Sequence, residues 1–284
     1  MSESVDCRHC TAPVQPGRHF CEHCGAEQRM LFSGPAEALD LRQVAGITDR
    51  GRRRDHNEDA VAVGTLGPLS AAVVCDGVAS SPGSAAAASH AVQAGLRGLL
   101  DAAARGEDPS IATTAGALAG AAAAAALGDP SDDNPPCTTY VSALAAEDEA
   151  AVGWVGDSAA YWAGPEGLSR LTVDDSAAGR LTAAGVQLED PRLADPTAHA
   201  LERWLGADAG EVVPQVYQFT PPTPGLILVC SDGLSRYLDA GLVVLADYRG
   251  RPAEIAQELL TDALEVGGHD NVTIAVIACQ GPLV

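Results

Sequence analysis

Four carboxylates in this chain stand where an apolar run ends or begins. The clearest case is the run 71–75, which stops at Asp76, while Asp157 and Asp232 close similar runs and Asp270 comes just before another. A short apolar run bounded by Gly and Pro is typical of a buried strand. A carboxylate at such a strand end is costly unless a positive charge meets it. Because oxygen ligands suit hard divalent cations, the pattern predicts a metal site.

A second metal site is predicted at the start of the chain. Two Cys-x-x-Cys pairs lie there, separated by ten residues: Cys7, Cys10, Cys21 and Cys24. Paired thiolates at this spacing are typical of one tetrahedral zinc, and four sulfurs would close the site, so we expect a structural ion. His9 and His23 lie inside the pairs and are the alternative ligands. A unit this short would take most of its folding energy from the metal.

The overall charge argues against several partners. The 284 residues include 38 acidic and 17 basic side chains, giving a formal net charge of −21. Such a surface repels nucleic-acid phosphates and anionic lipid, so we expect neither nucleic acid nor membrane as a partner. No apolar run reaches membrane-spanning length, and residues 1–6 do not resemble a signal peptide, so we expect a cytoplasmic protein. In that compartment we do not expect the cysteines to form disulfides.

The remaining pattern predicts an α+β fold. Helices are expected at 84–104 and 252–266, with another at 110–127 that opens at the cap Asp108-Pro109. Strands are expected at 44–47, 60–66, 71–75, 138–145, 150–155, 159–162, 226–230 and 272–279. Strands in blocks with helices in pairs, rather than strict alternation, favour packed sheets with helices outside.

Three units are predicted along the chain. Residues 1–29 form the zinc ribbon, and 30–40 read as a linker because Gly and Pro interrupt them. Residues 41–284 form the main domain. Within it, residues 174–206 are polar and irregular, and we expect a short helix and a flap there.

Six short motifs lie along the main domain in this order: Arg54-Asp-His-Asn-Glu-Asp59, Asp76-Gly77, Gly156-Asp-Ser158, Leu171-Thr-Val-Asp-Asp-Ser176, Ser231-Asp-Gly-Leu234 and Asp270-Asn-Val-Thr273. The same order is found in the metal-dependent type 2C serine/threonine phosphatases, and the main domain resembles the bacterial members of that family. Each motif alone is weak, but six in order are specific. The resemblance implies an α-β-β-α sandwich of two antiparallel sheets flanked by helices, with metals at one end.

The resemblance also implies roles for residues around two Mg²⁺ or Mn²⁺ ions. Oxygen-only ligands favour these ions over zinc. Asp76 matches the carboxylate that bridges the ions. Glu58 and the Gly77 carbonyl match ligands of one ion, and Asp232 and Asp270 match ligands of the other.

Three further residues receive roles from the same resemblance. Asp59 matches a carboxylate that accepts hydrogen bonds from metal-bound water, and Arg54 matches the arginine that binds substrate phosphate through two nitrogens. The alternative is that Arg52, Arg53 and Arg54 form a basic turn that only offsets nearby acids. Asp157 matches the aspartate that, with the equivalent of Asp232, holds a third, weaker ion in bacterial members.

The chain also departs from the family pattern. Val78 stands where some members have a histidine acid, Ala159 where arginine is common, and Asp175 where histidine is common. None of these removes a ligand of the two main ions. They concern the substrate contacts, the third ion and the proton donor for the leaving group.

The expected activity is hydrolysis of phosphoserine and phosphothreonine in proteins, with a metal-bridging water as nucleophile. Its expected partners are phosphoprotein substrates, a serine/threonine kinase or its targets, and the expected state is a monomer. One alternative is a weakly active pseudophosphatase that binds phosphoproteins or a kinase as a scaffold. Another is a zinc-ribbon nucleic-acid binder, which the acidic composition opposes.

Overall fold

The structure is a computed structural model of the whole chain. It describes residues 38–187, 190–245 and 249–280, with 5–6, 12–14, 23 and 29–32 ahead of them. Cys7, Cys10, Cys21 and Cys24 lie outside the described residues, so the zinc ribbon stays a prediction. Among the helices that are described, none combines the length and apolar character needed to cross a bilayer.

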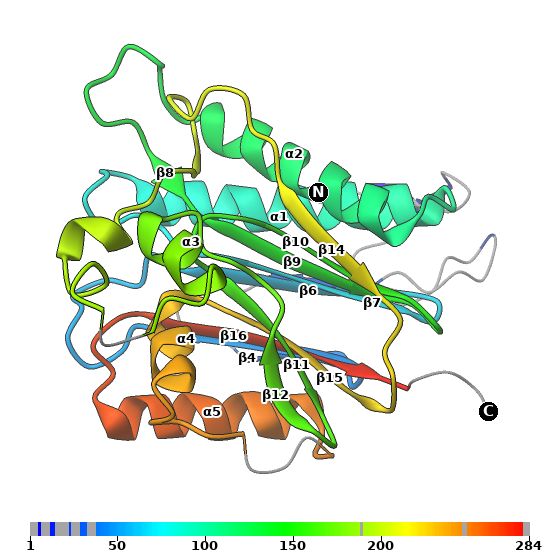
Figure 1. The fold of residues 1–284 in the computed structure, drawn as a ribbon. Helices are drawn as coiled ribbons and strands as arrows, with labels where there is room; N and C mark the ends of the chain where they lie inside the picture. Colours follow the sequence, from blue (N-terminus) through cyan, green and yellow to red (C-terminus); the bar gives the residue numbers. More distant parts are fainter. Residues whose placement is uncertain are drawn as a thin grey trace.

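Two six-stranded antiparallel sheets form the centre of the fold (Figure 1). In spatial order the first contains β14 (Gln215–Phe219), β10 (Ala150–Val155), β9 (Tyr140–Ala145), β7 (Leu69–Cys75), β6 (Ala60–Leu66) and β3 (Arg29–Phe32). The second contains β12 (Gly167–Arg170), β11 (Ala159–Gly164), β15 (Gly225–Cys230), β16 (Val272–Cys279), β5 (Val44–Asp49) and β4 (Ala38–Asp40). Two short pairs add β1 (Val5–Asp6) with β2 (Pro13–Val14), and β8 (Cys137–Thr138) with β13 (Leu205–Gly206).

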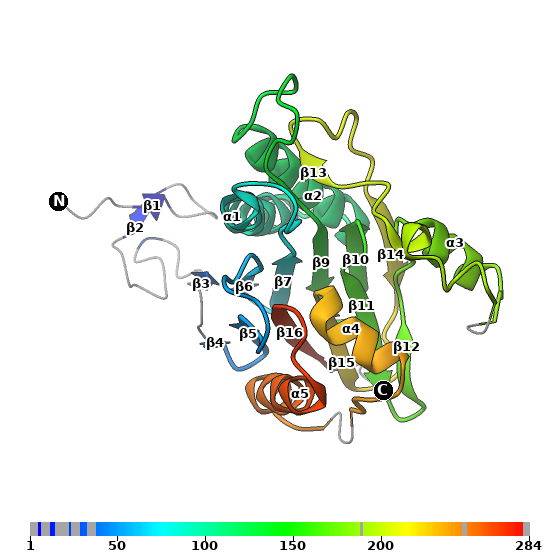
Figure 2. The ribbon, with the colours of Figure 1, turned by 90° about the vertical axis from the view of Figure 1, so that its left-hand side faces the viewer.

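Helices cover both outer faces of the sandwich (Figure 2). The first sheet is covered by α1 (Ser84–Ala104) and α2 (Pro109–Ala125), and the second by α4 (Asp232–Asp239) and α5 (Pro252–Val266). A separate segment holds α3 (Ala177–Ala183) and a 3-10 helix (Pro196–His199). Three apolar cores separate the four layers, the middle one built mainly from Val, Ala and Ile side chains of both sheets.

The predicted sandwich is confirmed, and several elements match closely. The two helices α1 and α5 begin and end where the sequence predicted. The predicted cap of α2 also holds, because the Asp108 side chain accepts a hydrogen bond from the Ser110 amide at 2.9 Å and proline follows at the first helical position.

Other elements differ from the prediction. Asp232 was expected at a strand end, but it begins α4, a helix that the prediction missed. At eight residues, α4 is shorter than the roughly ten residues that a helical pattern needs to be distinguished from a strand. The strands β12 and β14 were also missed. The segment 30–40, read as a linker, contributes to β3 and β4, which pair with β6 and β5 at the edges of the two sheets.

Candidate active site

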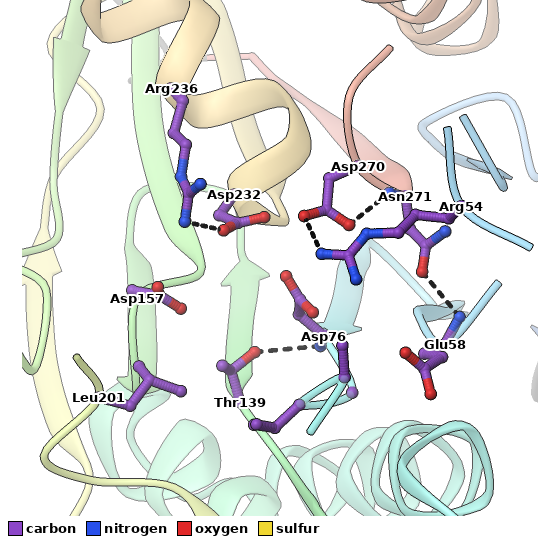
Figure 3. Close-up of a pocket in the computed structure, with 13 residues that line it drawn as sticks. Arg54, Glu58, Asp76, Thr139, Asp157, Leu201, Asp232, Arg236, Asp270 and Asn271 are labelled. Carbon is purple, nitrogen blue, oxygen red and sulfur yellow. Dashed lines mark hydrogen bonds and ion pairs between the residues drawn. The ribbon is translucent and has the colours of Figure 1, made fainter. Parts of the chain in front are cut away.

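One polar pocket of about 200 Å³ gathers most of the predicted site residues (Figure 3). Its walls include the residues predicted at both ions and at the substrate: Arg54, Glu58, Asp76, Gly77, Asp157, Asp232 and Asp270. They come from segments more than 200 residues apart in sequence, joined at one end of the sandwich. Asp59 does not line the pocket and is buried behind it.

The backbone around Asp76 is fixed by the neighbouring segment. The Asp76 amide donates to Thr139 Oγ1 at 3.0 Å, and the Asp76 carbonyl accepts from the Thr139 amide and from Thr138 Oγ1, both at 2.8 Å. A bridge between Gly77 and Thr138 extends this pairing beyond β7. The peptide groups are therefore satisfied, and the Asp76 side chain is left to face the pocket.

Two glycines after the aspartates permit close approach of other backbone segments. A Cβ on Gly77 would lie 2.6 Å from the Glu58 carbonyl oxygen, and one on Gly233 would lie 1.9 Å from the Asn271 carbonyl oxygen. Gly77 does not have a positive φ, so its glycine is not explained by a left-handed backbone conformation. Its role is to let the segment carrying Glu58 pass beside Asp76.

Asn271 ties the loop before β6 to the start of β16. Its side-chain oxygen accepts from the Glu58 amide at 2.9 Å, and its side-chain nitrogen donates to the carbonyls of Arg50 and His56 at 2.8 and 2.9 Å. Glu58 is also held through its side chain, whose Oε1 accepts from Ser84 Oγ at 2.7 Å. The buried side-chain amide of Asn271 thus holds the segment that carries Arg54 and Glu58 beside Asp270.

The turn that carries Asp157 is held from two sides. Gly156 has a φ of 105°, and its amide donates to Asp175 Oδ2 at 2.9 Å. On the other side, the hydroxyls of Ser158 and Thr139 are hydrogen-bonded at 2.6 Å. Thr139 therefore links the turn of Asp157 to the backbone of Asp76.

Two arginines pair with carboxylates in the pocket. Arg54 Nη2 lies 2.6 Å from Asp270 Oδ2, and Arg236, one turn along α4, forms an ion pair with Asp232. Figure 3 shows the two pairs on opposite sides of Asp76. Over the described residues, no three His, Cys, Asp or Glu side chains already stand in the arrangement of a metal site.

The comparison with known families decides where this site belongs. The sequence profile described as "Protein phosphatase 2C" matches residues 48–265, which hold the pocket residues from Arg54 to Arg236. The chain belongs to the protein phosphatase 2C family. The two-sheet sandwich predicted from the resemblance is therefore that of the family.

Two bacterial relatives are similar in sequence to this chain. The chain is 29% identical over 147 residues to the serine/threonine phosphatase stp of Listeria innocua, covering 51% of this chain and 58% of that protein. It is 30% identical over 237 residues to the serine/threonine protein phosphatase PstP of Mycobacterium tuberculosis, covering 82% of this chain and 44% of PstP. The matched part thus spans about half the length of these curated relatives.

A solved structure supports the same fold. The crystal structure of the catalytic domain of PstP in complex with two manganese ions superposes with a TM-score of 0.63. The match covers 89% of this chain and all of that domain, at 26% identity.

The residues at this phosphatase 2C site fit divalent ions. Both carboxylate oxygens of buried Asp59 lack a hydrogen-bond partner among the described residues. Water molecules bound to a divalent ion would donate the hydrogen bonds that this buried carboxylate lacks. The donors facing the pocket are all oxygen atoms, which suits Mg²⁺ or Mn²⁺.

Burial and mutual repulsion raise the pKa values of the clustered carboxyls. Burial raises the pKa of Asp59 to about 7, opposed by the nearby hydroxyls of Thr273 and Ser231, and raises the pKa of Asp157 to about 7 with help from the charge of Asp232. The pKa of Asp76 lies well above its ordinary value because of burial and then the charge of Asp59. Burial also raises the pKa of Asp232, against the charge of Arg236. The buried carboxyl cluster is therefore more stable when protons or cations neutralise it.

Sequence reasoning missed four residues that build the site: Ser84, Thr139, Arg236 and Asn271. Asn271 lay inside a quoted motif but received no role. Ser84 and Thr139 carry no local signal, because their partners Glu58 and Asp76 are distant in sequence. Arg236 had a signal that could have found it, since a residue four positions after a helical aspartate shares its face.

The raised pKa values predict how the chelator-treated protein responds to pH. Asp59 has a pKa of about 7 when folded against an ordinary 3.8, so the folded state binds more protons between these values. Its contribution therefore makes the free energy of unfolding fall as pH rises through that window, by up to about 1.4 kcal/mol per pH unit, and level off above pH 7. Asp59→Asn should flatten the curve measured by denaturant unfolding between pH 5 and 8. Asp148→Asn, in an exposed turn, is the control, and equal slopes in the two variants would contradict the assignment.

Proposed function

We propose that this chain is a metal-dependent protein phosphatase that hydrolyses phosphoserine and phosphothreonine. The observation that carries the proposal is the convergence of Glu58, Asp76, Asp232 and Asp270 on one pocket in a phosphatase 2C fold. The names of the bacterial relatives support the same activity. A pocket with the whole carboxylate set also favours an enzyme over a scaffold that only binds phosphoproteins.

The proposed ligands of two Mg²⁺ or Mn²⁺ ions are those implied by the resemblance. Asp76 would bridge the ions, Glu58 and the Gly77 carbonyl would serve one, and Asp232 and Asp270 the other. Asp76 suits the bridging role because it lies between the two arginine–aspartate pairs (Figure 3). When bound, the ions would supply positive charge at the phosphoryl oxygens and a water of lowered pKa.

The chain's own residues would bind the substrate and manage protons. Arg54 lines the pocket and has a raised pKa, chiefly through its hydrogen bond to Asp270, so it stays charged and can bind a phosphate dianion. Asp59, buried with two unsatisfied oxygens, would orient water next to Asp76. Val78 lines the pocket and has no acidic proton, so the leaving alkoxide would take its proton from water.

The amino-terminal unit is proposed to bind one structural zinc through Cys7, Cys10, Cys21 and Cys24. The support is their spacing, together with the antiparallel pairing of β1 and β2, which flank Cys7 and Cys10 in sequence. Its acidic context favours docking of a protein partner such as a kinase or phosphoprotein over nucleic acid. The free thiols of buried Cys75 and Cys230 are consistent with a reducing, cytoplasmic setting.

Replacing the proposed bridging ligand tests the activity directly. Asp76→Asn should lower Mn²⁺-dependent hydrolysis of a phosphothreonine peptide by more than about a hundredfold, since a neutral amide cannot hold two cations together. The fold should survive, because the change removes a buried charge. Calorimetric titration should show weakened Mn²⁺ binding. Asp133→Asn, in an exposed loop, is the matched control, and a variant that keeps more than a few percent of wild-type turnover would exclude the bridging role.

Replacing Arg54 tests the proposed phosphate contact. Arg54→Ala should lower kcat/KM for the phosphopeptide by about ten- to hundredfold, because a charge-assisted hydrogen bond contributes about 1.5–3 kcal/mol. Arg54→Lys should recover only part of the loss, since lysine cannot bind through two planar nitrogens. Arg53→Ala, at an exposed position of the same loop, is the control. If the Arg53 variant loses more activity than the Arg54 variant, the basic-turn alternative is favoured.

Removing the amino-terminal unit tests the zinc proposal. The truncation should delete residues 1–27 so that β3, an edge strand of the first sheet, is kept. We expect the protein to lose about one zinc per chain by elemental analysis while retaining Mn²⁺-dependent hydrolysis of a small phosphopeptide. The paired replacement Cys21→Ser with Cys24→Ser in the full chain should remove the same zinc. Unchanged zinc content would show that these cysteines are not the ligands.

A further inference from the structure

Arg236 lies at the junction of two cavities. It lines the active-site pocket and also a larger cavity of about 610 Å³ between α4 and the segment around α3. Asp157 and Asp232 line both cavities as well. These are the two carboxylates at which the resemblance places a third, weaker ion in bacterial members.

The charge of Arg236 is directed at those carboxylates. It forms an ion pair with Asp232 one helical turn away, so both side chains extend from the same face of α4. Asp232, then Asp157, Asp270 and Asp76 in decreasing order, favour its charged form. Figure 3 shows the guanidinium on the Asp232 side of the pocket, with Asp157 below it and Arg54 on the far side of Asp76.

The neighbouring carboxylate cannot readily complete a third ion site. Asp174 also lines the larger cavity, but Arg170 forms ion pairs with it and with Asp239. The position next to Asp157 and Asp232 therefore already contains a cation of the chain. A divalent ion there would be repelled by this fixed charge and would have to displace it from Asp232.

We infer that Arg236 takes the place of the third divalent ion, so that a guanidinium on α4, rather than an exchangeable metal, balances Asp157 and Asp232. The inference rests on the proposed two-metal function and concerns the number of ions that the chain holds. Arginine suits the role because its charge persists across the physiological pH range and its planar fork matches carboxylates. A cation attached to the chain is also present at every metal concentration.

Counting bound manganese in the full chain tests this. Metal-stripped protein is equilibrated with millimolar Mn²⁺, and the bound Mn²⁺ is measured by equilibrium dialysis with elemental analysis, which separates manganese from zinc. The wild type should hold two Mn²⁺ per chain. Arg236→Asp should hold three, because it removes the fixed cation and adds a carboxylate beside Asp157 and Asp232. Arg236→Lys, which keeps the charge, should hold two.

The control and the contrary outcomes separate this inference from the proposed function. Arg251→Asp makes the same charge change at an exposed position just before α5 and should hold two Mn²⁺. Thermal unfolding establishes that each variant is folded; the Arg236 side chain is 67% exposed, so its replacement leaves the cores intact. Three Mn²⁺ in the wild type, or two in folded Arg236→Asp, would overturn the inference alone. Absence of Mn²⁺ binding by the wild type would overturn the proposed function and the inference together.

Discussion

The repulsion among carboxylates buried at one end of the sandwich is the constraint on which this site depends. Burial is the largest cause of the raised pKa in each of Asp59, Asp76, Asp157 and Asp232. Such a cluster is stable only when protons or cations neutralise it. Arg54 and Arg236 supply two positive charges at the pocket, fewer than the acidic groups around them. The remaining demand for cations is what suits the pocket to the divalent ions proposed for it.

A cluster that repels itself must be held by contacts other than its own. Asp76 is fixed through its peptide groups by Thr138 and Thr139, and the loop carrying Glu58 is fixed by the side-chain amide of Asn271. These neutral hydrogen bonds satisfy the backbone and leave the Asp76 side chain facing the pocket. The glycines after Asp76 and Asp232 serve the same end, because they let neighbouring strands approach the aspartates closely. The neutral residues around the pocket thus hold the carboxylates in place, while the carboxylates themselves supply the charge.

This division explains what could be predicted from the sequence. Elements whose apolar pattern is bounded by Gly or Pro, such as α1, α5 and β16, were predicted to the residue, and the ordered motifs located most of the pocket. The short helix α4 and the weakly buried strand β14 lack such a pattern and were missed. The contacts of Ser84, Thr139 and Asn271 were missed for a different reason: each joins segments far apart in sequence, and only the fold brings them together.

The departure at Asp175 shows how such a contact can be specific to this chain. Its carboxylate accepts from the Gly156 amide through Oδ2, and from Gln215 at 2.8 Å and Arg203 at 3.2 Å through Oδ1. A neutral histidine, common at this position in the family, has one acceptor nitrogen and could not satisfy three donors. Arg203 belongs to the segment predicted as a flap, while the Gly156 amide directly precedes Asp157. Asp175 therefore couples the flap to the turn that carries Asp157.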